Sequence, residues 1–556
     1  MDSSTVTLPP VSYKPEPGNK NCGSLKSRFD LLNGRRSGKM KVAYDCSKFT
    51  IPTLLPENPD LQTAYRNLQD NRCSLGARAV NNLASKLLMA LFPTNAPFFK
   101  ISANEVIVQQ LGNLDAQQEK SVESPGIKSA VDEKLSVFES IIMSLFEREA
   151  VRATIFEILK LLIVTGDAMF KKVPGKPLKA YSLNSFVLTR DGDGEVTEII
   201  IREYVGYSGL SDELKQVLTE RGANFGERFD PLNSNLELYT IVKKKSENLF
   251  ETWQELAGVK VPGSEGNYNS DTLPYHAVRW NKILNENYGR GKVEEHLGDL
   301  RTLENDAKTM DMMTRAAGKI IPMVNPNGVT RIEALNRARD GEFVYGKRED
   351  ITFLVTEKYN DMSVIQSHFA EIKMDIKSAF LMDSVVQRNG ERVTAEEIRT
   401  VASELETGLG GVYSVLSQDF QLPLVKLMYE EVKHEFKRLG VEKELKLDDD
   451  LKLVITTGID AIGRGNDANR LITFLRGLAE TRDPRFMSWI VLPDLIKRYG
   501  ASLGINMAGL VKTPEQKAQE DQQAQQMAMG QALLGEASKA APDVIRQQMV
   551  SPNTTE

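Results

Sequence analysis

The chain has few of the residues that build most metal and nucleophilic sites. Its 556 residues include only three cysteines and four histidines. Cys22, Cys46 and Cys73 show no C-x-x-C spacing, which indicates a reducing compartment and no disulfide framework. The histidines are scattered without partners at ligand spacing, and they are His276, His296, His368 and His434. We therefore expect no metal ion and no cofactor.

Long hydrophobic runs are also missing. The apolar stretch 86–93 is far shorter than the roughly 20 residues that a membrane-spanning helix needs. The stretch 155–170 is interrupted by Glu157, Lys160 and Asp167. The N-terminal residues show no basic-then-apolar pattern of a targeting signal. These features predict a soluble protein without membrane contact.

Catalytic signatures are lacking as well. The sequence contains no G-x-S-x-G elbow, no H-E-x-x-H pair, no dinucleotide fingerprint and no kinase set. Gly175 and Lys176 are followed by proline, and the glycine-rich stretch 458–465 is not followed by Lys-Ser or Lys-Thr, so both fail the phosphate-loop test. The acid pair Glu396 and Glu397 fits the first turn of a helix, where carboxylates are favoured by the helix dipole. We expect the protein not to be an enzyme.

Net positive charge is absent too. The formal net charge is −6, with 26% charged and 41% hydrophobic residues. A protein that binds DNA tightly is usually basic over its binding face, so the negative net charge argues against tight nucleic-acid binding. Loose contact through a few local basic positions stays open. At roughly 150 residues per domain, the length predicts about three or four units.

The first half of the chain reads as helices followed by antiparallel strands. We expect helices over residues 25–36, 74–91 and 127–165, the last ending at Gly166 and Asp167. The sequence SFVLTRDGDGEVTEIIIRE predicts a hairpin that turns at residues 191–194, and further strands are expected near 236–243 and 273–280. The same turn resembles the start of a calcium loop, but Arg202 stands where that loop needs glutamate.

A helix–insertion–helix pattern follows. Helical spacing starts near residue 291, gives way to short strands, turns and a short helix over 320–356, and resumes over 361–380. One face of the second helix carries Ile365, Phe369, Ile372, Ile376 and Phe380. The opposite face carries Ser363, Gln366, Ala370, Lys373 and Lys377. Periodicity alone favours a solvated role for these lysines.

A charged bend separates this helix from the next. Thr394 and Glu397 are spaced as a capping box, which predicts a helix start at Thr394. We expect one long helix over 394–439 that passes Gly410 and kinks at Pro423. Beyond it we expect a strand, a glycine-rich loop and a helix from about residue 466. The Gln-, Ala- and Met-rich tail predicts either a peripheral helix or a mobile segment.

Four stretches together resemble a known family. They are GARAVNNLASKLLMALFP (76–93), YGRGKVEEHLGDLRTLEN (288–305), RNGERVTAEEIRTVASELETGLGGVYSVLSQDFQLPLV (388–425) and TTGIDAIGRG (456–465). In this order they resemble the portal, or head-to-tail connector, protein of short-tailed, podovirus-type bacteriophages. The resemblance runs over residues 25–531, apart from 246–269. It implies a ring, typically of twelve subunits, at one capsid vertex, through which double-stranded DNA enters during packaging and leaves during ejection.

The resemblance also implies a domain plan and a fold class. The fold class would be α+β and predominantly α-helical, with the wing, stem, clip and crown of the phage portal fold. The plan is a flexible leader (1–24), a wing (25–290), a first stem helix (291–319), a clip (320–356), a second stem helix (357–381), a tunnel loop (382–393), a long wing helix (394–439), a crown (440–512) and a tail (513–556).

Site residues and partners follow from the same resemblance. The tunnel-loop residues expected to face DNA are Gln387, Arg388, Asn389, Glu391 and Arg392. Lys373 and Lys377 would form the channel face of the stem. The clip docking surface would include Arg331, Lys347 and Arg348. Implied partners are a terminase motor, a tail adaptor, and capsid and internal core or scaffold proteins, with the ring assembled in the host cytoplasm and carried in the virion.

An acidic total suits a channel for moving DNA. Each neutralised phosphate adds salt-dependent affinity, so a translocating duplex is best served by sparse basic contacts. Contacts with bases are not expected. The alternative function is a nucleic-acid enzyme of the packaging machinery, either an ATPase or a nuclease.

Overall fold

The computed structural model describes most of the first 440 residues. The described ranges are 24–56, 71–94, 98–103, 138–221, 223, 230–231, 235–318, 321–354, 359–382, 395–439 and 453–457, with short pieces at 471–477, 480, 495–496, 499–500 and 527. Two compact units result. The first comprises Met1–Phe99, Ile142–Val441 and Ile455–Ile459; the second comprises Lys100–Ile141, Glu442–Val454 and Asp460–Glu556. The expected leader, nearly all of the expected tunnel loop and most of the expected crown and tail lie outside the described residues.

Three helices open the first unit. They are α1 (Ser24–Arg35), α2 (Ser37–Phe49) and α3 (Leu75–Leu91). The helices predicted over 25–36 and 74–91 are confirmed, whereas α2 was missed because its sequence has a short and weak apolar stripe. Along α3 the predicted stripe is fully buried, and its members are Val80, Leu83, Leu87 and Leu91.

The prediction of one continuous helix over 127–165 is wrong. Residues 127–137 lie outside the described part, residues 138–148 are helical, and a new helix, α6 (Val151–Thr165), follows a break. Ala150 at the break has φ of 50°, a left-handed conformation that stops a helix. The predicted end is confirmed, since Gly166 adopts φ of 83° and its N–H bonds to the carbonyl of Leu162 at 2.9 Å.

Antiparallel strands form the main sheet. Its strands run in the order β4 (Phe186–Arg190), β5 (Val196–Gly206), β6 (Asn235–Ser246), β7 (Leu249–Leu256) and β8 (Val259–Lys260), while β9 (Gly266–Asn269) also pairs with β7. The predicted hairpin is confirmed in the pairing of β4 with β5. Because side chains alternate between faces, β5 sends Ile200 towards α1 and Ile199 and Ile201 towards α2.

A second, smaller sheet lies beside α6. It contains β10 (Tyr275–Arg279), β2 (Asp167–Lys171) and β3 (Lys179–Tyr181) in that order. A short 3-10 turn, η1 (Leu183–Ser185), leads from β3 to β4, and α7 (Asp212–Glu220) follows β5. The strands predicted near 236–243 and 273–280 correspond to β6 and β10 and are confirmed.

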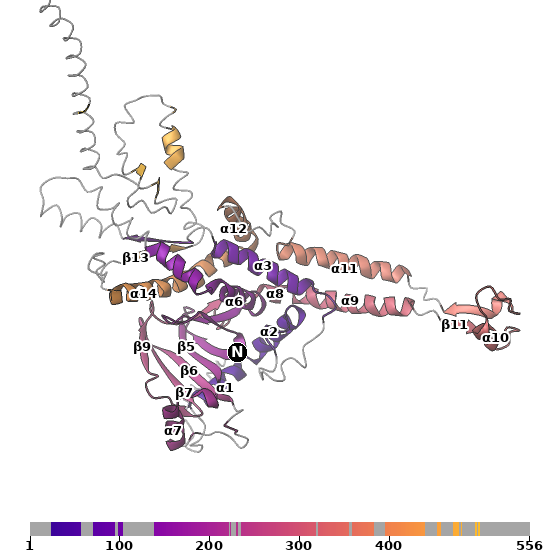
Figure 1. The fold of residues 1–556 in the computed structure, drawn as a ribbon, viewed down its shortest axis with the longest axis horizontal. Coiled ribbons are helices and arrows are strands. Elements are labelled where there is room, and N and C mark those ends of the chain that lie inside the picture. The colour runs from indigo at the N-terminus through magenta and orange to yellow at the C-terminus, as the bar shows by residue number, and fades with distance from the viewer. Residues whose placement is uncertain are drawn as a thin grey trace, which may run out of the picture. The chain divides into compact units, whose positions relative to one another are not determined.

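The helix–insertion–helix pattern is present as predicted. Two long helices, α9 (Leu297–Ala317) and α11 (Tyr359–Ala379), lie side by side (Figure 1), and α8 (Lys292–Glu295) precedes the first. Between them the chain forms β11 (Ile321–Val324), α10 (Ile332–Arg337) and β12 (Ile351–Leu354). We call residues 321–354 the insertion. Its two strands pair with each other, Ile321 opposite Leu354 and Val324 opposite Ile351.

The single helix predicted over 394–439 is wrong. The chain forms α12 (Ala395–Leu409), α13 (Val412–Leu416), a π-helix (Ser417–Gln421) and α14 (Leu422–Leu439). Gly410 breaks the first part because it adopts φ of 59°. The π-helix lies directly before Pro423, whose missing N–H disrupts regular helical bonding, so the disturbance expected at this proline takes the form of a widened turn.

An aromatic cluster joins these late helices to α3. Phe92 contacts Phe98, Phe420 and Phe146, with ring centroids 4.9, 5.4 and 5.9 Å apart. Beside it, the side chain of Gln421 donates to the carbonyl of Leu91. Separately, β1 (Phe99–Ala103) pairs with β13 (Leu453–Thr457), which confirms the strand predicted there. Within the described ranges, no helix is both long and apolar enough to cross a membrane.

Candidate channel and docking surfaces

The apolar face of α11 packs on α9 at the end of the helix pair near the main body. Ile376 and Phe380 of the predicted stripe are buried, as are Leu300 and Leu303 of α9. Farther along, the ring of His368 meets the carboxylate of Asp306, with 3.0 Å between Nδ1 and Oδ2. Burial decreases along the pair, because the side chains of Ile365 to Ile372 on this stripe are only half-buried.

The predicted lysines lie beside the face of α11 that packs on α9, and not opposite it, because Lys373 and Lys377 are only about 60° and 100° around the helix from Ile376. Lys373 is exposed and Lys377 is half-buried, and their spacing of one turn places them on the same side of the helix. Glu371 and Asp375 are also exposed and lie on the other flank by helical geometry. On α11, these lysines and these acids therefore form a basic flank and an acidic flank on either side of the face that packs on α9.

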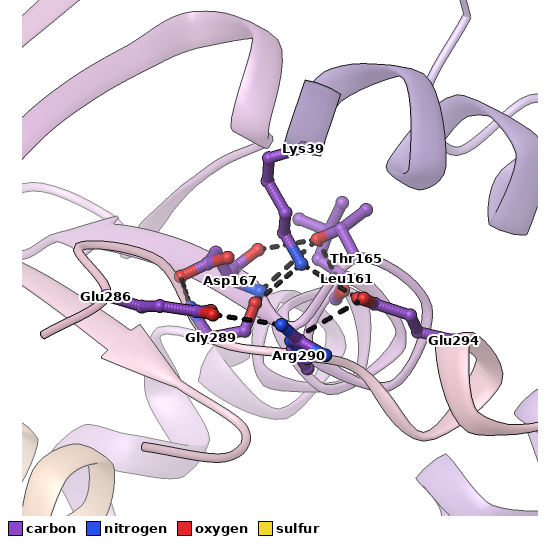
Figure 2. Close-up of polar contacts among 8 residues, drawn as sticks. All are labelled: Lys39, Leu161, Thr165, Asp167, Glu286, Gly289, Arg290 and Glu294. Carbon is purple, nitrogen blue, oxygen red and sulfur yellow. Dashed lines mark hydrogen bonds and ion pairs between the residues drawn. The ribbon is translucent and has the colours of Figure 1, made fainter. Parts of the chain in front are cut away.

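Three glycines fix the base of this helix pair. In Figure 2 the turn after α6 lies against the loop 289–291, which leads into α8. A Cβ atom added to Gly166 would lie 2.6 Å from the backbone of Arg290, and one added to Gly291 would lie 2.6 Å from the carbonyl oxygen of Ile163. Gly289 makes the same close approach to the carbonyl oxygen of Gly166, at 2.7 Å. Only glycine allows these two backbone segments to cross at this separation.

A buried carboxylate holds the same crossing. Asp167 Oδ1 accepts the N–H of Gly289 at 2.8 Å (Figure 2), whereas Oδ2 has no hydrogen-bond partner among the described residues. Burial raises the pKa of Asp167 to about 7, and the nearby charge of Lys39 offsets part of this shift. Loss of solvation disfavours a charge that receives only one hydrogen bond.

Charged side chains surround this buried acid. Lys39 of α2 donates to the carbonyl of Gly289 at 2.5 Å and to Glu294 of α8 at 3.0 Å. Arg290 pairs with Glu286 at 2.9 Å and approaches Glu294 at 3.8 Å, as Figure 2 also shows. The start of the helix pair is thus tied to α2 and α6 through both backbone and ion-pair contacts.

The C-terminal end of α11 is held by α3. Asn82 donates to the carbonyls of Phe380 and Leu381, each at 3.3 Å, and the ammonium group of Lys86 donates to the carbonyl of Leu381 at 2.6 Å. Lys86 also lies 3.8 Å from Glu404 of α12. A cation at a helix C-terminus is favourable because it meets the negative end of the dipole. Burial lowers the pKa of Lys86, while Glu404 acts to raise it.

The predicted docking residues lie on the insertion. Arg331, Lys347 and Arg348 are all exposed. Lys347 N–H donates to the Thr330 hydroxyl at 2.9 Å, which fixes the backbone but leaves the ammonium group outside. The insertion brings these three basic residues onto one small element, far in sequence from Lys373 and Lys377.

The expected tunnel-loop residues Gln387, Arg388, Asn389, Glu391 and Arg392 lie outside the described residues. The sequence did not indicate the anchors of the helix pair. Lys86 and Asp167 had no local signal beyond being charged residues in apolar surroundings, because their partners lie 295 and 122 residues away.

The loop that failed the phosphate-loop test is held by carboxylates. Gly175 N–H donates to Glu431 of α14 at 2.7 Å, and the buried ammonium of Lys172 lies 2.8 Å from Glu431 and 2.7 Å from Glu149. The carboxylates therefore take the N–H of Gly175 and the ammonium group of Lys172. Among the described residues, no cluster of three or more His, Cys, Asp or Glu side chains could hold a metal ion.

Sequence comparisons with known proteins agree on one family. The sequence profile of the family described as bacteriophage head to tail connecting protein matches residues 23–510. The portal protein of Escherichia phage T7 is 36% identical over 527 residues, covering 93% of this chain and 94% of that protein. The portal protein of Enterobacteria phage T3 is 37% identical over 498 residues, covering 88% and 89%. A chain in the neck of an empty GTA particle matches with a TM-score of 0.32 and 10% identity, covering 72% of this chain and 86% of that one.

Proposed function

The chain belongs to the bacteriophage head-to-tail connecting family and is a portal protein, and we propose that it assembles into a closed ring whose central channel conducts double-stranded DNA. DNA would enter through this ring during packaging and leave through it during ejection. Identity of 36–37% to two portal proteins over at least 88% of the chain carries this proposal. The resemblance to portal proteins implies a ring, typically of twelve copies, and contacts between unlike surfaces give such a ring when their rotation closes.

The helix pair α9 and α11 is the proposed stem. Its charged flanks support this assignment, because Lys373 and Lys377 lie on one side of α11 and Glu371 and Asp375 on the other. The lysines would face the duplex as sparse basic rings, each multiplied by the symmetry of the assembly. Weak, repeated phosphate contacts allow DNA to slide, whereas a continuous basic wall would hold it.

The remaining domains follow from the stem. The insertion would be the clip, the region before α8 together with α12–α14 the wing, and the region beyond residue 440 the crown. The tunnel loop would join the stem to α12 and contribute Gln387, Arg388, Asn389, Glu391 and Arg392. Lys86 supports this connection, because it contacts Leu381, just after α11, and lies near Glu404 of α12.

Partners are expected at the ends of the ring. We propose that a terminase motor docks on the clip during packaging and that a tail adaptor later takes the same place. Arg331, Lys347 and Arg348 are the proposed docking residues because they are exposed basic groups on the insertion. Capsid and internal core or scaffold proteins would surround the wing and crown, with assembly in the host cytoplasm before incorporation into the virion.

Electron microscopy of the pure protein tests ring formation. Negative-stain images should show closed rings with a central hole. Sheets or icosahedral shells would contradict the proposal and indicate a capsid component without a channel. Because imaging uses the whole chain, it requires no assumption about which domains fold alone.

A charge-reversal experiment tests the channel face. Rings of Lys373→Glu with Lys377→Glu should bind a linear duplex with a shallower dependence on salt, because each lost phosphate contact lowers the slope of log affinity against log salt by about one. The matched control is Arg35→Glu with Lys41→Glu, two exposed basic residues on α1 and α2. The assigned face would be contradicted if the salt dependence decreased equally in both double variants. It would also be contradicted if Lys373→Glu with Lys377→Glu left the salt dependence unchanged.

The enzyme alternative has its own test. We propose that the chain supplies no ATP hydrolysis and that the motor is a separate protein. The pairing of Gly175 and Lys172 with Glu431 supports this, since the loop is already occupied by a carboxylate. Hydrolysis of ATP by the pure protein that is lost in Lys176→Ala would contradict the proposal.

A further inference from the structure

Two buried polar atoms of opposite charge lie without a partner at the base of the helix pair. Within the described ranges, neither Oδ2 of Asp167 nor Nη1 of Arg36 has a hydrogen-bond partner. The two residues are 1% and 5% exposed. Burial raises the pKa of Asp167 and lowers that of Arg36, and the charge of each residue offsets part of the shift of the other. Leaving a buried donor and a buried acceptor unpaired is costly, so the two atoms require an explanation.

The rest of the Arg36 side chain is held in place. Its Nη2 donates to the carbonyl of Leu183 at 2.8 Å, and its Nε donates to Oδ1 of Asn33 at 3.0 Å. The guanidinium group also lies over the ring of Tyr288, 5.3 Å from the ring centroid. These contacts keep Arg36 beside the buried acid and leave Nη1 as its spare donor.

The surroundings of Asp167 favour both of its protonation states. The positive groups around it are Lys39 of α2, Arg36 directly before α2, Arg190 of β4 and, next to Arg190, Arg279 of β10. The other titratable groups are Glu294 of α8 and, in the loop before α8, Glu286, Tyr288 and Arg290. The positive charges favour the ionised carboxylate, whereas burial with a single N–H donor favours the protonated acid. Burial raises the pKa of Asp167 to about 7, so both forms are populated near neutral pH.

Arg190 differs from Arg36 in having no spare donor of this kind. Its Nε donates to the carbonyl of Asn287 at 3.0 Å, and Nη1 and Nη2 donate to the carbonyls of Gly194 and Ala277 at 3.0 and 3.4 Å. Arg190 therefore acts on Asp167 through its charge alone. Arg36 can in addition form a hydrogen bond to the carboxylate without giving up a bond to the backbone.

We propose that Asp167 and Arg36 form a proton-dependent ion pair that ties the start of α2 to the turn after α6. With the proton present, the side chain of Asp167 holds only the N–H of Gly289, as in Figure 2. When the proton leaves to solvent, Oδ2 accepts the spare N–H of Arg36. Lys39, three residues further along, holds the carbonyl of Gly289 and the carboxylate of Glu294, so the new bond acts on the start of the helix pair.

Variants of the two arginines test the ion pair. Asp167→Asn is made in each background, and the pH at which it stops gaining stability relative to its parent reports the folded pKa of Asp167. Arg36→Gln should raise this pH by about one to three units, because the ionised carboxylate loses its partner. Arg190→Gln is the matched control and should raise it less, although in the present arrangement Arg190 acts on the pKa of Asp167 at least as strongly as Arg36. An equal or larger shift in Arg190→Gln would overturn the inference.

Structures of the unaltered chain complete the test, because Arg36→Gln also loses the bond to Leu183. High-resolution structures at pH 5 and pH 9 should place Nη1 of Arg36 within about 3 Å of Oδ2 of Asp167 only at pH 9. Asp167→Asn should show the pH 5 arrangement at both values. An unchanged Arg36 in the two wild-type structures, or the same movement in Asp167→Asn, would overturn the inference. Neither measurement involves DNA, so its result is independent of the proposed channel function.

Discussion

Replacing Asp167 with asparagine should change how the stability of the first unit depends on pH. Asparagine keeps an oxygen that can accept the N–H of Gly289 but can carry no charge. In the wild type, burial raises the pKa of Asp167 from 3.8 to about 7. The folded chain therefore retains a proton up to about pH 7 that the unfolded chain releases near pH 4.

The sign and size follow from proton linkage. Between about pH 4 and pH 7 the unfolded chain binds fewer protons, so the free energy of unfolding of the wild type falls as pH rises. The loss is about 1.4 kcal/mol per pH unit, or about 4 kcal/mol over roughly three units. Above the folded pKa no further loss is expected. Asp167→Asn cannot bind this proton. Its free energy of unfolding relative to that of the wild type should therefore increase between about pH 4 and pH 7 and then stay constant.

Denaturant unfolding at a series of pH values measures this difference. Subtracting wild type from variant cancels the titration of all other groups, and the same transition must be compared because a chain of two units need not unfold in one step. Asp193→Asn, which changes an exposed acid in the β4–β5 turn, is the matched control. A difference between wild type and Asp167→Asn that stays constant from about pH 4 to pH 8 would refute the reasoning.

Three further outcomes are expected. Gly166→Ala should lower the free energy of unfolding by about 3 kcal/mol or more, measured by thermal or denaturant unfolding. Gly175→Ala should lower it by only about 1–2 kcal/mol, because Gly175 has a similar φ but open space around it. Equal losses of stability would mean that the close backbone approach at Gly166 is unimportant. Lys86→Met removes the charged donor to the carbonyl of Leu381 and should lower the free energy of unfolding by about 1–3 kcal/mol. Amide hydrogen exchange near residue 380 should also become faster. Unchanged exchange there would contradict the anchoring role of Lys86. Arg388→Glu with Arg392→Glu should leave ring assembly intact but impair DNA packaging or retention, and normal genome content in particles would exclude a tunnel-loop role.

Local patterns predicted the elements whose residues interact with near neighbours in sequence. The stripe of α3, the apolar face of α11 and the Asp-Gly turn between β4 and β5 all depend on spacing within a few residues. The insertion between the two long helices was also predicted, because Pro322 and Pro326 prevent a continuous helix. These elements are the ones that frame the proposed channel and docking surfaces.

Continuity of long helices was predicted less well. Ala150 and Gly410 both adopt left-handed φ values, and alanine gives no warning of this in the sequence. Strands β7 to β9 were missed because their residues include charged and polar side chains on the exposed face. Tertiary packing determines such breaks and edges, so spacing alone did not indicate them.

The anchors of the helix pair could not be predicted at all. The bonds from Asn82 to Leu381 and from Gly289 to Asp167 join positions 299 and 122 residues apart. A side chain that binds a distant backbone group leaves no periodic trace in its own segment. The resemblance to portal proteins supplied the domain plan, whereas the contacts that hold the plan together required coordinates.

The carboxylate of Glu431 has a consequence for synthesis of the chain. Its partner Gly175 lies 256 residues earlier, and Lys172 is buried in the same contact. At about 5–20 residues per second, a ribosome needs roughly 13 to 50 s to travel that distance. During this time the Lys172 ammonium can pair with Glu149, but the N–H of Gly175 and the second ion pair of Lys172 must wait for the carboxylate of α14. A chain truncated before α14 should therefore lack the contacts that close this part of the first unit.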